Sequence, residues 1–187
     1  MLTSTLRRAT FLVSLCLIGL ATTHAQPGGG LRLSALKIDS DAFEDGGVIP
    51  DRFAGRSGVQ PGFSFSALPE SAVSIAVIFH DLDVALNNGT EDVLHWIAWN
   101  IPATAGGIPE GRLPDGSVQG TNLMRTNAYV GPGAPSGERY HHYVFEFYAL
   151  NQSLDLDAET GREQLLAAME GKVVAKAAYI GRYRGTE

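Results

Sequence analysis

Three short segments rich in β-branched and aromatic residues constrain the fold of this chain more than any other feature. They are residues 71–79 (SAVSIAVIF), 94–101 (LHWIAWNI) and 142–150 (HYVFEFYAL). Short apolar runs of this kind, bounded by turn-forming residues, are typical of strands in the interior of a sheet. The Asn87-Asn88-Gly89 sequence between the first two runs indicates a turn. We therefore expect a mostly β protein.

The rest of the chain adds two strands and one helix to this expectation. Residues 31–38 alternate apolar Leu31, Leu33 and Ala35 with polar or basic neighbours, which predicts a half-buried strand. Residues 159–170 predict a helix, with Thr160 as its cap, Gly171 after its end, and a shared apolar face (Leu165, Leu166 and Met169). Residues 173–180 contain alanines that fit a helix, but Val and Tyr favour a strand, which we expect.

The N-terminal 25 residues have the layout of a secretory signal peptide. Arg7 and Arg8 precede an apolar run over residues 9–21, and Ala25 follows at a small-residue cleavage position. The apolar run is too short for a permanent membrane anchor, so we expect no stable membrane insertion. The expected organisation is a signal peptide over residues 1–25, a flexible leader over 26–30 and one domain over 31–187. We accordingly expect an exported protein, periplasmic or secreted, cleaved after Ala25.

Composition after cleavage excludes several classes of function. Removing residues 1–25 leaves 12 basic and 20 acidic residues, a formal net charge of −8. Nucleic-acid binders usually carry a basic surface, so that class of partner is not expected. Cleavage also removes Cys16, the only cysteine. The exported chain therefore has neither a disulfide nor a cysteine nucleophile.

Polar residues stand at the ends of the three central strands. His80 and Asp81 follow the first strand, His95 begins the second, and His141 begins the third, two residues before Tyr143. If these strands are neighbours, their polar ends gather in one pocket. Protonated imidazole, Tyr O–H and backbone N–H groups are all hydrogen-bond donors to an anion. The pattern predicts a small anion-binding site.

Each of these residues, taken alone, also has a purely structural explanation. An aspartate at a strand end is commonly a turn former, and a histidine there commonly makes a local hydrogen bond. His142 alternates to the face opposite His141 and Tyr143, so we expect it to face solvent. The stripe of Tyr143, Phe145 and Phe147 is expected to lie mostly in the core.

Three ordered motifs resemble those of the phosphatidylethanolamine-binding protein family. Residues 129–143 (YVGPGAPSGERYHHY) match the family's Tyr-Val-Gly, Gly-x-Pro-x-Gly and His-x-Tyr pattern. Residues 81–85 keep both acids of its Asp-Pro-Asp-Ala-Pro box, and His95-Trp96 matches its His-Trp pair. The agreement covers roughly residues 31–183, and the late helix is similar to that of the bacterial, Raf-kinase-inhibitor-like branch.

The resemblance implies a two-sheet antiparallel β-sandwich with a small pocket at one end. It also implies that six residues of the matching motifs bind the ligand and that two more support the pocket. The pocket of the family takes small anions, including phospholipid head groups, and no cofactor is implied. The ligand-binding residues would be Asp81, His95, Gly133, Pro135, His141 and Tyr143, supported by Asp83 and Trp96.

The motifs depart from the family pattern at several positions. Leu82 and Ala85 replace both prolines of the acidic box, which predicts a less rigid loop, because proline fixes φ. Ala134 replaces a loop proline and His142 replaces an arginine, changes that alter the rim of the pocket. The preferred ligand is therefore left open.

Three functions remain open on this sequence. The first is a non-catalytic binding protein for a small phosphorylated or carboxylated ligand; no catalytic residue is assigned, since Ser136 lies outside a Gly-x-Ser-x-Gly motif. The second is a hydrolase or isomerase using Asp81 with His95 or His141 as an acid–base pair. The third is an inhibitor of a protein partner such as a protease, and a homodimer is also open. A zinc site at His80, Asp81, His95 and His141 is a weaker variant without the usual ligand spacing, so no metal is expected.

Overall fold

The computed structural model describes residues 33–137 and 139–186 of the chain. The expected signal peptide and leader lie outside the described residues, as do Leu31 and Arg32. Within the described part, no helix is long and apolar enough to cross a membrane.

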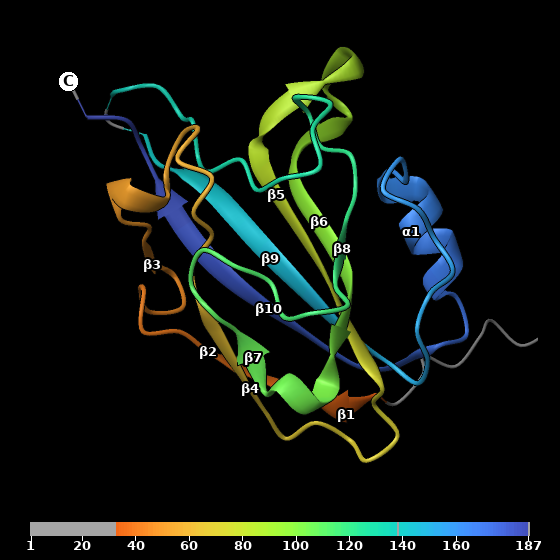
Figure 1. The fold of residues 1–187 in the computed structure, drawn as a ribbon. Helices are drawn as coiled ribbons and strands as arrows, with labels where there is room; N and C mark the ends of the chain where they lie inside the picture. The colour runs from red at the N-terminus through yellow and green to blue at the C-terminus, as the bar shows by residue number, and fades with distance from the viewer. Residues whose placement is uncertain (1–32, 138, 187) are drawn as a thin grey trace, which may run out of the picture. The chain divides into compact units, whose positions relative to one another are not determined.

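The larger of two sheets has seven strands, drawn as arrows in Figure 1. Its order is β1–β10–β9–β5–β6–β8, and β3 pairs with the free part of β10. The four long strands pair antiparallel, whereas β1 and β3 run parallel to β10. The strands are β1 (Ser34–Ala35), β3 (Gly47–Val48), β5 (Ser74–Leu86), β6 (Glu91–Pro102), β8 (Val118–Gln119), β9 (His141–Leu150) and β10 (Val173–Tyr183).

The smaller sheet packs its apolar side chains against the larger one. It consists of β2 (Lys37–Asp39), β4 (Phe63–Ser66) and β7 (Gly107–Ile108). Phe63 and Phe65 of β4 are buried and alternate with exposed serines. Phe63 meets Phe145 and Phe147 of β9 with ring centroids 4.9 and 5.0 Å apart. The expected two-sheet, mostly β fold is confirmed, as is the core position of the β9 aromatic residues.

Both faces of β5 are covered, which explains its unbroken apolar sequence. Val77 and Phe79 belong to the core between the two sheets. Ile78 lies on the other face, in a cluster with Leu165 and Met169 of α1 (Arg162–Met169). A strand buried on both sides needs apolar residues at every position rather than at alternate ones.

The helix is shorter than predicted, and its first residue differs. Its N-cap residue is Gly161, whose N–H donates to Oε1 of Gln164 at 2.8 Å, so the prediction of a Thr160 cap was wrong. Leu165 and Met169 are buried as expected, but Leu166 is exposed. Gly171 has φ +72°, a left-handed conformation that favours glycine at a helix end.

Two strand predictions need correction. Leu33 and Ala35 are exposed, whereas Leu36 and Ile38 are buried, so the first strand buries the opposite set and is broken between β1 and β2. The central strand continues past Asp81 to Leu86. Proline has a fixed φ and no backbone N–H. Because Leu82 and Ala85 stand where the family pattern has proline, this segment can continue as a strand.

Three short 3-10 helices complete the described fold. Asn87, Asn88 and Gly89 all have positive φ in η2 (Asn87–Gly89), which confirms the turn between β5 and β6. The others are η1 (Asp51–Phe53) and η3 (Ala103–Ala105).

Candidate ligand-binding pocket

A pocket of about 330 Å³ opens where β5, β6 and β9 come together near the β5–β6 hairpin. The sheet register creates it, because Asp81 of β5 lies opposite Tyr143 of β9 on one side and Val93 of β6 on the other. Figure 1 shows this end of the sheet beside the loop that precedes β9. The pocket is lined by Gly55, Arg56, Asp81, Val84, Val93, His95, Leu123, Val130, Gly131, Gly133, Ala134, Pro135, His141 and Tyr143.

All six predicted ligand-binding residues line this one pocket. Asp81, His95, His141 and Tyr143 contribute polar side chains to it, and Gly133 and Pro135 belong to its loop wall. The rings of His95 and His141 both approach Tyr143, with centroids 5.4 and 6.4 Å away. Asp83 and Trp96 lie outside the lining.

Asp81 is a buried carboxylate held by hydrogen-bond donors on both of its oxygens. Its side chain is 3% exposed; Oδ2 lies 2.9 Å from Nδ1 of His141, and Oδ1 accepts the N–H of Asp83 at 2.9 Å. Because a carboxylate only accepts, the Nδ1 atom of His141 carries the proton. This leaves Nε2 of His141 as the ring nitrogen available to a ligand.

Tyr143 brings a neutral phenol to the same place. Its side chain is buried, and its oxygen accepts the N–H of Gly133 at 3.3 Å. Burial, with the negative charge of Asp81, raises the pKa of Tyr143. The phenol therefore keeps its proton, which it donates to the Asp81 carboxylate.

His95 is a neutral histidine with a defined tautomer. Its Nδ1 atom lies 3.1 Å from the carbonyl oxygen of Val130, which can only accept, so Nδ1 carries the proton. Burial lowers the pKa of His95, although the Val130 carbonyl and the charge of Asp81 oppose the shift. Its Nε2 atom is then a lone-pair acceptor. The sequence predicted that the imidazole rings of the pocket are charged donors. For His95 the structure instead indicates a neutral ring whose Nε2 atom accepts.

The two residues predicted to support the pocket contact segments beside its lining. Asp83 accepts the backbone N–H of His142 at 2.6 Å, contacts its Nδ1 at 2.9 Å and pairs with Arg139. It thereby ties the end of β5 to the loop before β9. Trp96 is fully buried; it donates to Gln119 at 2.7 Å and packs edge-on against Tyr129.

His80 faces away from the pocket. Successive side chains of a strand point to opposite faces, so His80 and Asp81 separate. The ring of His80 contacts Asp92 at 2.5 Å and lies 3.8 Å from Glu146, on the face that carries α1. The four residues of the zinc variant are therefore not assembled, and no group of three or more His, Cys, Asp or Glu in the described part of the chain is arranged to hold a metal ion.

Sequence reasoning missed Arg56, the one arginine or lysine among the described lining residues. Backbone hydrogen bonds bring its segment to the pocket: the Gly55 N–H donates to Pro132 at 2.7 Å, and the Gly131 N–H donates to Gly55 at 2.8 Å. Gly131 permits this approach, since a Cβ there would stand 1.9 Å from the carbonyl oxygen of Phe53. The only local signal was the glycine beside the arginine.

Residues 39–184 match the sequence pattern of the phosphatidylethanolamine-binding protein family. A UPF0098 protein of Methanothermobacter thermautotrophicus is 41% identical over 155 residues, covering 80% of this chain and 99% of that protein. The crystal structure of CT736 from Chlamydia trachomatis, a putative homologue of this family, has 32% identity and a TM-score of 0.73 over 82% of this chain and 99% of its own. The structure of Escherichia coli YbcL, with 24% identity, shares the fold with a TM-score of 0.73 over 82% of this chain and all of its own.

Proposed function

The chain belongs to the phosphatidylethanolamine-binding protein family. From that premise, we propose that it is a non-catalytic protein that binds a small anion in the pocket around Asp81 and His141. The ligand class is a phosphate, a phospholipid head group or a carboxylate. The pocket volume of about 330 Å³ suits a ligand of this size.

The observation that carries the proposal is the set of fixed polar groups around that cavity. Arg56 supplies a permanent positive charge, and Tyr143 supplies a phenol that stays protonated. Protein hydrogen bonds orient Asp81, His95 and His141 before any ligand arrives. None of the described lining residues is a Ser, Thr, Cys or Lys, so the lining holds no hydroxyl, thiol or amine nucleophile of those four types.

Export is part of the same proposal. Residues 1–25 have the charge and hydropathy pattern of a signal peptide, and their removal leaves no cysteine. Mass spectrometry of the protein recovered outside the cytoplasm would then give a chain beginning at Gln26. An intact Met1 terminus on the exported protein would contradict the cleavage.

Binding is tested by nuclear magnetic resonance of the histidine rings during titration with phosphate, acetate and phosphoethanolamine. We expect the signals of His95 and His141 to move with at least one ligand. His141→Gln should weaken that ligand at least ~10-fold, because it removes a lining ring and one of the donors that hold Asp81. His142→Gln is the matched control, since its neighbouring ring is exposed and outside the lining. Unmoved His95 and His141 signals with all three ligands would refute the proposal.

The contact between Asp81 and His141 favours one alternative, a hydrolase or isomerase. An aspartate that holds Nδ1–H of a histidine leaves Nε2 to act as a general base. A screen of phosphate esters, carboxylic esters and isomerase substrates would then show turnover that His141→Gln abolishes and His142→Gln spares. A pocket that binds ligands without turnover in that screen favours the binding protein.

A further inference from the structure

A second groove, of about 320 Å³, lies where the end of β10 meets β3 and the segment that follows it. Figure 1 shows these segments side by side near the C-terminus. The lining includes Val48, Pro50, Tyr140, Tyr183 and Arg184, and none of its residues lines the ligand-binding pocket. The groove is therefore a separate cavity, to which the proposed function assigns no role.

Two arginines near the end of β10 stack on one aromatic ring at this groove. The guanidinium carbons of Arg184 and Arg182 lie 4.7 and 5.6 Å from the centroid of the Tyr140 ring. Backbone carbonyls hold both side chains: Nε of Arg182 donates to Gly46 at 2.9 Å, and Nη1 of Arg184 donates to Gly137 at 3.0 Å. Stacking uses the flat face of a guanidinium, so N–H groups at its edge are left for an anion.

The charge of Arg182 has no partner of opposite sign. Within the residues that the structure describes, Arg182 forms no ion pair, whereas three other arginines each face a carboxylate. The carboxylates of the adjoining segments already accept from protein donors: Asp45 accepts the N–H of Ile180 at 2.7 Å, and Asp51 accepts the phenol of Tyr183. In a chain of formal net charge −6, this exposed cation is a local exception.

Apolar surface accompanies the charge. Val48 of β3 is 48% exposed, and Pro50 lines the groove two residues later. The partly buried ring of Tyr140 belongs to the same lining. An inorganic anion would pair with arginine but leave this apolar surface in water. A ligand that carries an acid beside an apolar group uses both, and arginine and tyrosine are the residues enriched where proteins bind one another.

We propose that this groove docks an acidic peptide segment of a partner protein, with a carboxylate on Arg182 and a neighbouring apolar side chain against Val48 and Tyr140. A peptide fits better than an anionic membrane, because a peptide engages the groove alone, whereas a membrane surface would repel a chain of net charge −6. The site is distinct from the ligand-binding pocket, so this inference stands independently of the proposed function.

Three short peptides test the chemistry of the groove. The probe is the N-acetylated, C-amidated peptide Gly-Leu-Glu-Glu-Leu-Gly; one control has Gln for both Glu, and the other has Ala for both Leu. Nuclear magnetic resonance should show the Nε–H signal of Arg182 and the amides of β3 moving with the probe, with a dissociation constant on the order of 1 mM. The Gln peptide should bind about 10-fold more weakly, because it lacks the charge, and the Ala peptide about threefold more weakly.

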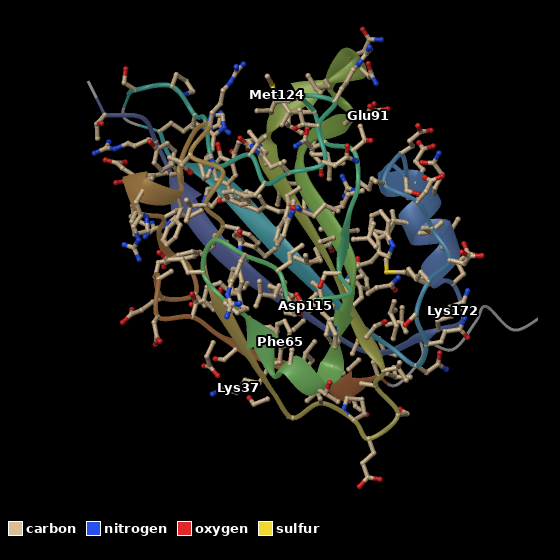
Figure 2. The ribbon with its side chains drawn as sticks, in the orientation of Figure 1. Lys37, Phe65, Glu91, Asp115, Met124 and Lys172 are labelled. Atoms are coloured by element: carbon tan, nitrogen blue, oxygen red, sulfur yellow. The ribbon has the colours of Figure 1, made fainter. Side chains whose placement is uncertain are left out.

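Variants of the stacked pair test the site itself. Arg182→Gln should weaken the probe about 10-fold, and Arg182→Lys should recover part of the loss, since it returns the charge without the planar group. Tyr140→Leu keeps an apolar side chain but removes the ring and should cost about threefold. Lys172→Gln is the control for net charge, because Figures 1 and 2 show Lys172 beside α1, on the side of the fold away from β3. It should change the affinity less than about twofold. Unchanged amide signals of β5 and β9 confirm that each variant is folded.

A competition experiment separates the groove from the pocket. Saturating phosphoethanolamine should leave the affinity of the probe unchanged, since the two cavities share no lining residue. Displacement of the probe by phosphoethanolamine would place the peptide in the pocket and overturn the inference. Equal binding of the Glu and Gln peptides, no binding of any peptide, or an Arg182→Gln variant no weaker than Lys172→Gln would also overturn it. So would Arg182-dependent binding to phosphatidylserine vesicles without peptide binding. Each of these results leaves the proposed function of the pocket to its own titration.

Discussion

The Asp81 carboxylate and the His141 ring face each other across neighbouring strands β5 and β9, with Oδ2 2.9 Å from Nδ1. The side chain of Asp81 is 3% exposed and that of His141 15% exposed. A buried carboxylate is stable only when donors satisfy it, and His141 provides one of them. The pair therefore fixes the positions of two lining side chains and stabilises the buried negative charge of Asp81.

Removing His141 should destabilise the protein. His141→Gln removes the imidazole donor of the buried Asp81, and we expect the free energy of unfolding to fall by about 2 kcal/mol. His142→Gln loses only a contact made by a half-exposed ring and should cost about 0.5 kcal/mol. Urea unfolding of the two variants compares them directly. Equal losses would mean that Asp81 does not depend on His141.

Asp83 should stabilise the rim of the pocket in a pH-dependent way. Partial burial alone would raise its pKa, but hydrogen bonds from the backbone and ring of His142 and from Arg139 lower it to about 2. Because this is below the ordinary value of 3.8, the stabilisation is present above about pH 4 and is lost as the pH falls through about 2.

The measurement is the difference in unfolding free energy between the wild type and Asp83→Asn. It should be about 1 kcal/mol at neutral pH, a modest value because Arg139 and His142 are exposed. It should shrink as the pH falls below about 4. A difference that is constant down to pH 2 would argue against the contacts of Asp83.

Two glycines of the pocket loop should respond very differently to alanine. A Cβ at Gly131 would stand 1.9 Å from the Phe53 carbonyl oxygen and 2.8 Å from Cα of Ala54, so backbone must move. We expect Gly131→Ala to cost at least about 3 kcal/mol and to displace Arg56 from the pocket. A Cβ at Gly133 meets no atom within 4 Å, so Gly133→Ala should cost less than about 0.5 kcal/mol. Thermal unfolding of the two variants tests the contrast, and similar stabilities would refute it.

A cluster of His80, Asp92 and Arg162 lies on the face of the sheet opposite the pocket. It should contribute stability without affecting ligand binding. Burial would raise the pKa of Asp92, but contacts with His80 and Arg162 hold it below its ordinary value. Asp92→Asn removes the charge that faces His80 at 2.5 Å and should cost about 2 kcal/mol in urea unfolding. Ligand affinity in the pocket should stay within about twofold of the wild type, because the sheet separates the two sites. A large loss of affinity would show that the two faces are coupled.

Much of the site was predictable because strand alternation is local. Asp81 and Tyr143 stand at strand positions that the register makes opposite, and His141 lies two residues before Tyr143 on the same face. The same alternation separates His80 from Asp81, and the sequence prediction missed this because it ended the strand at Phe79.

The remainder depends on contacts between distant segments. Arg56 reaches the pocket through backbone bonds from Gly55 to a loop about 76 residues later in the chain. No local periodicity encodes such a contact. The neutral state of His95 likewise depends on burial and on the carbonyl of Val130, 35 residues away. The buried face of β2 was misjudged because a two- or three-residue strand has too little alternation to read.

The charge state of His95 leads to a prediction with a definite sign. Burial lowers its pKa below the ordinary 6.5, so between the two values the unfolded chain binds the proton and the folded chain does not. The free energy of unfolding should therefore fall as the pH drops below about 6.5, and His95→Gln should remove that part of the slope. Ring ¹⁵N spectra of the wild type at about pH 7 should show a neutral ring with its proton on Nδ1. A titration midpoint at or above 6.5, or a proton on Nε2, would contradict the acceptor role that His95 has at the base of the pocket.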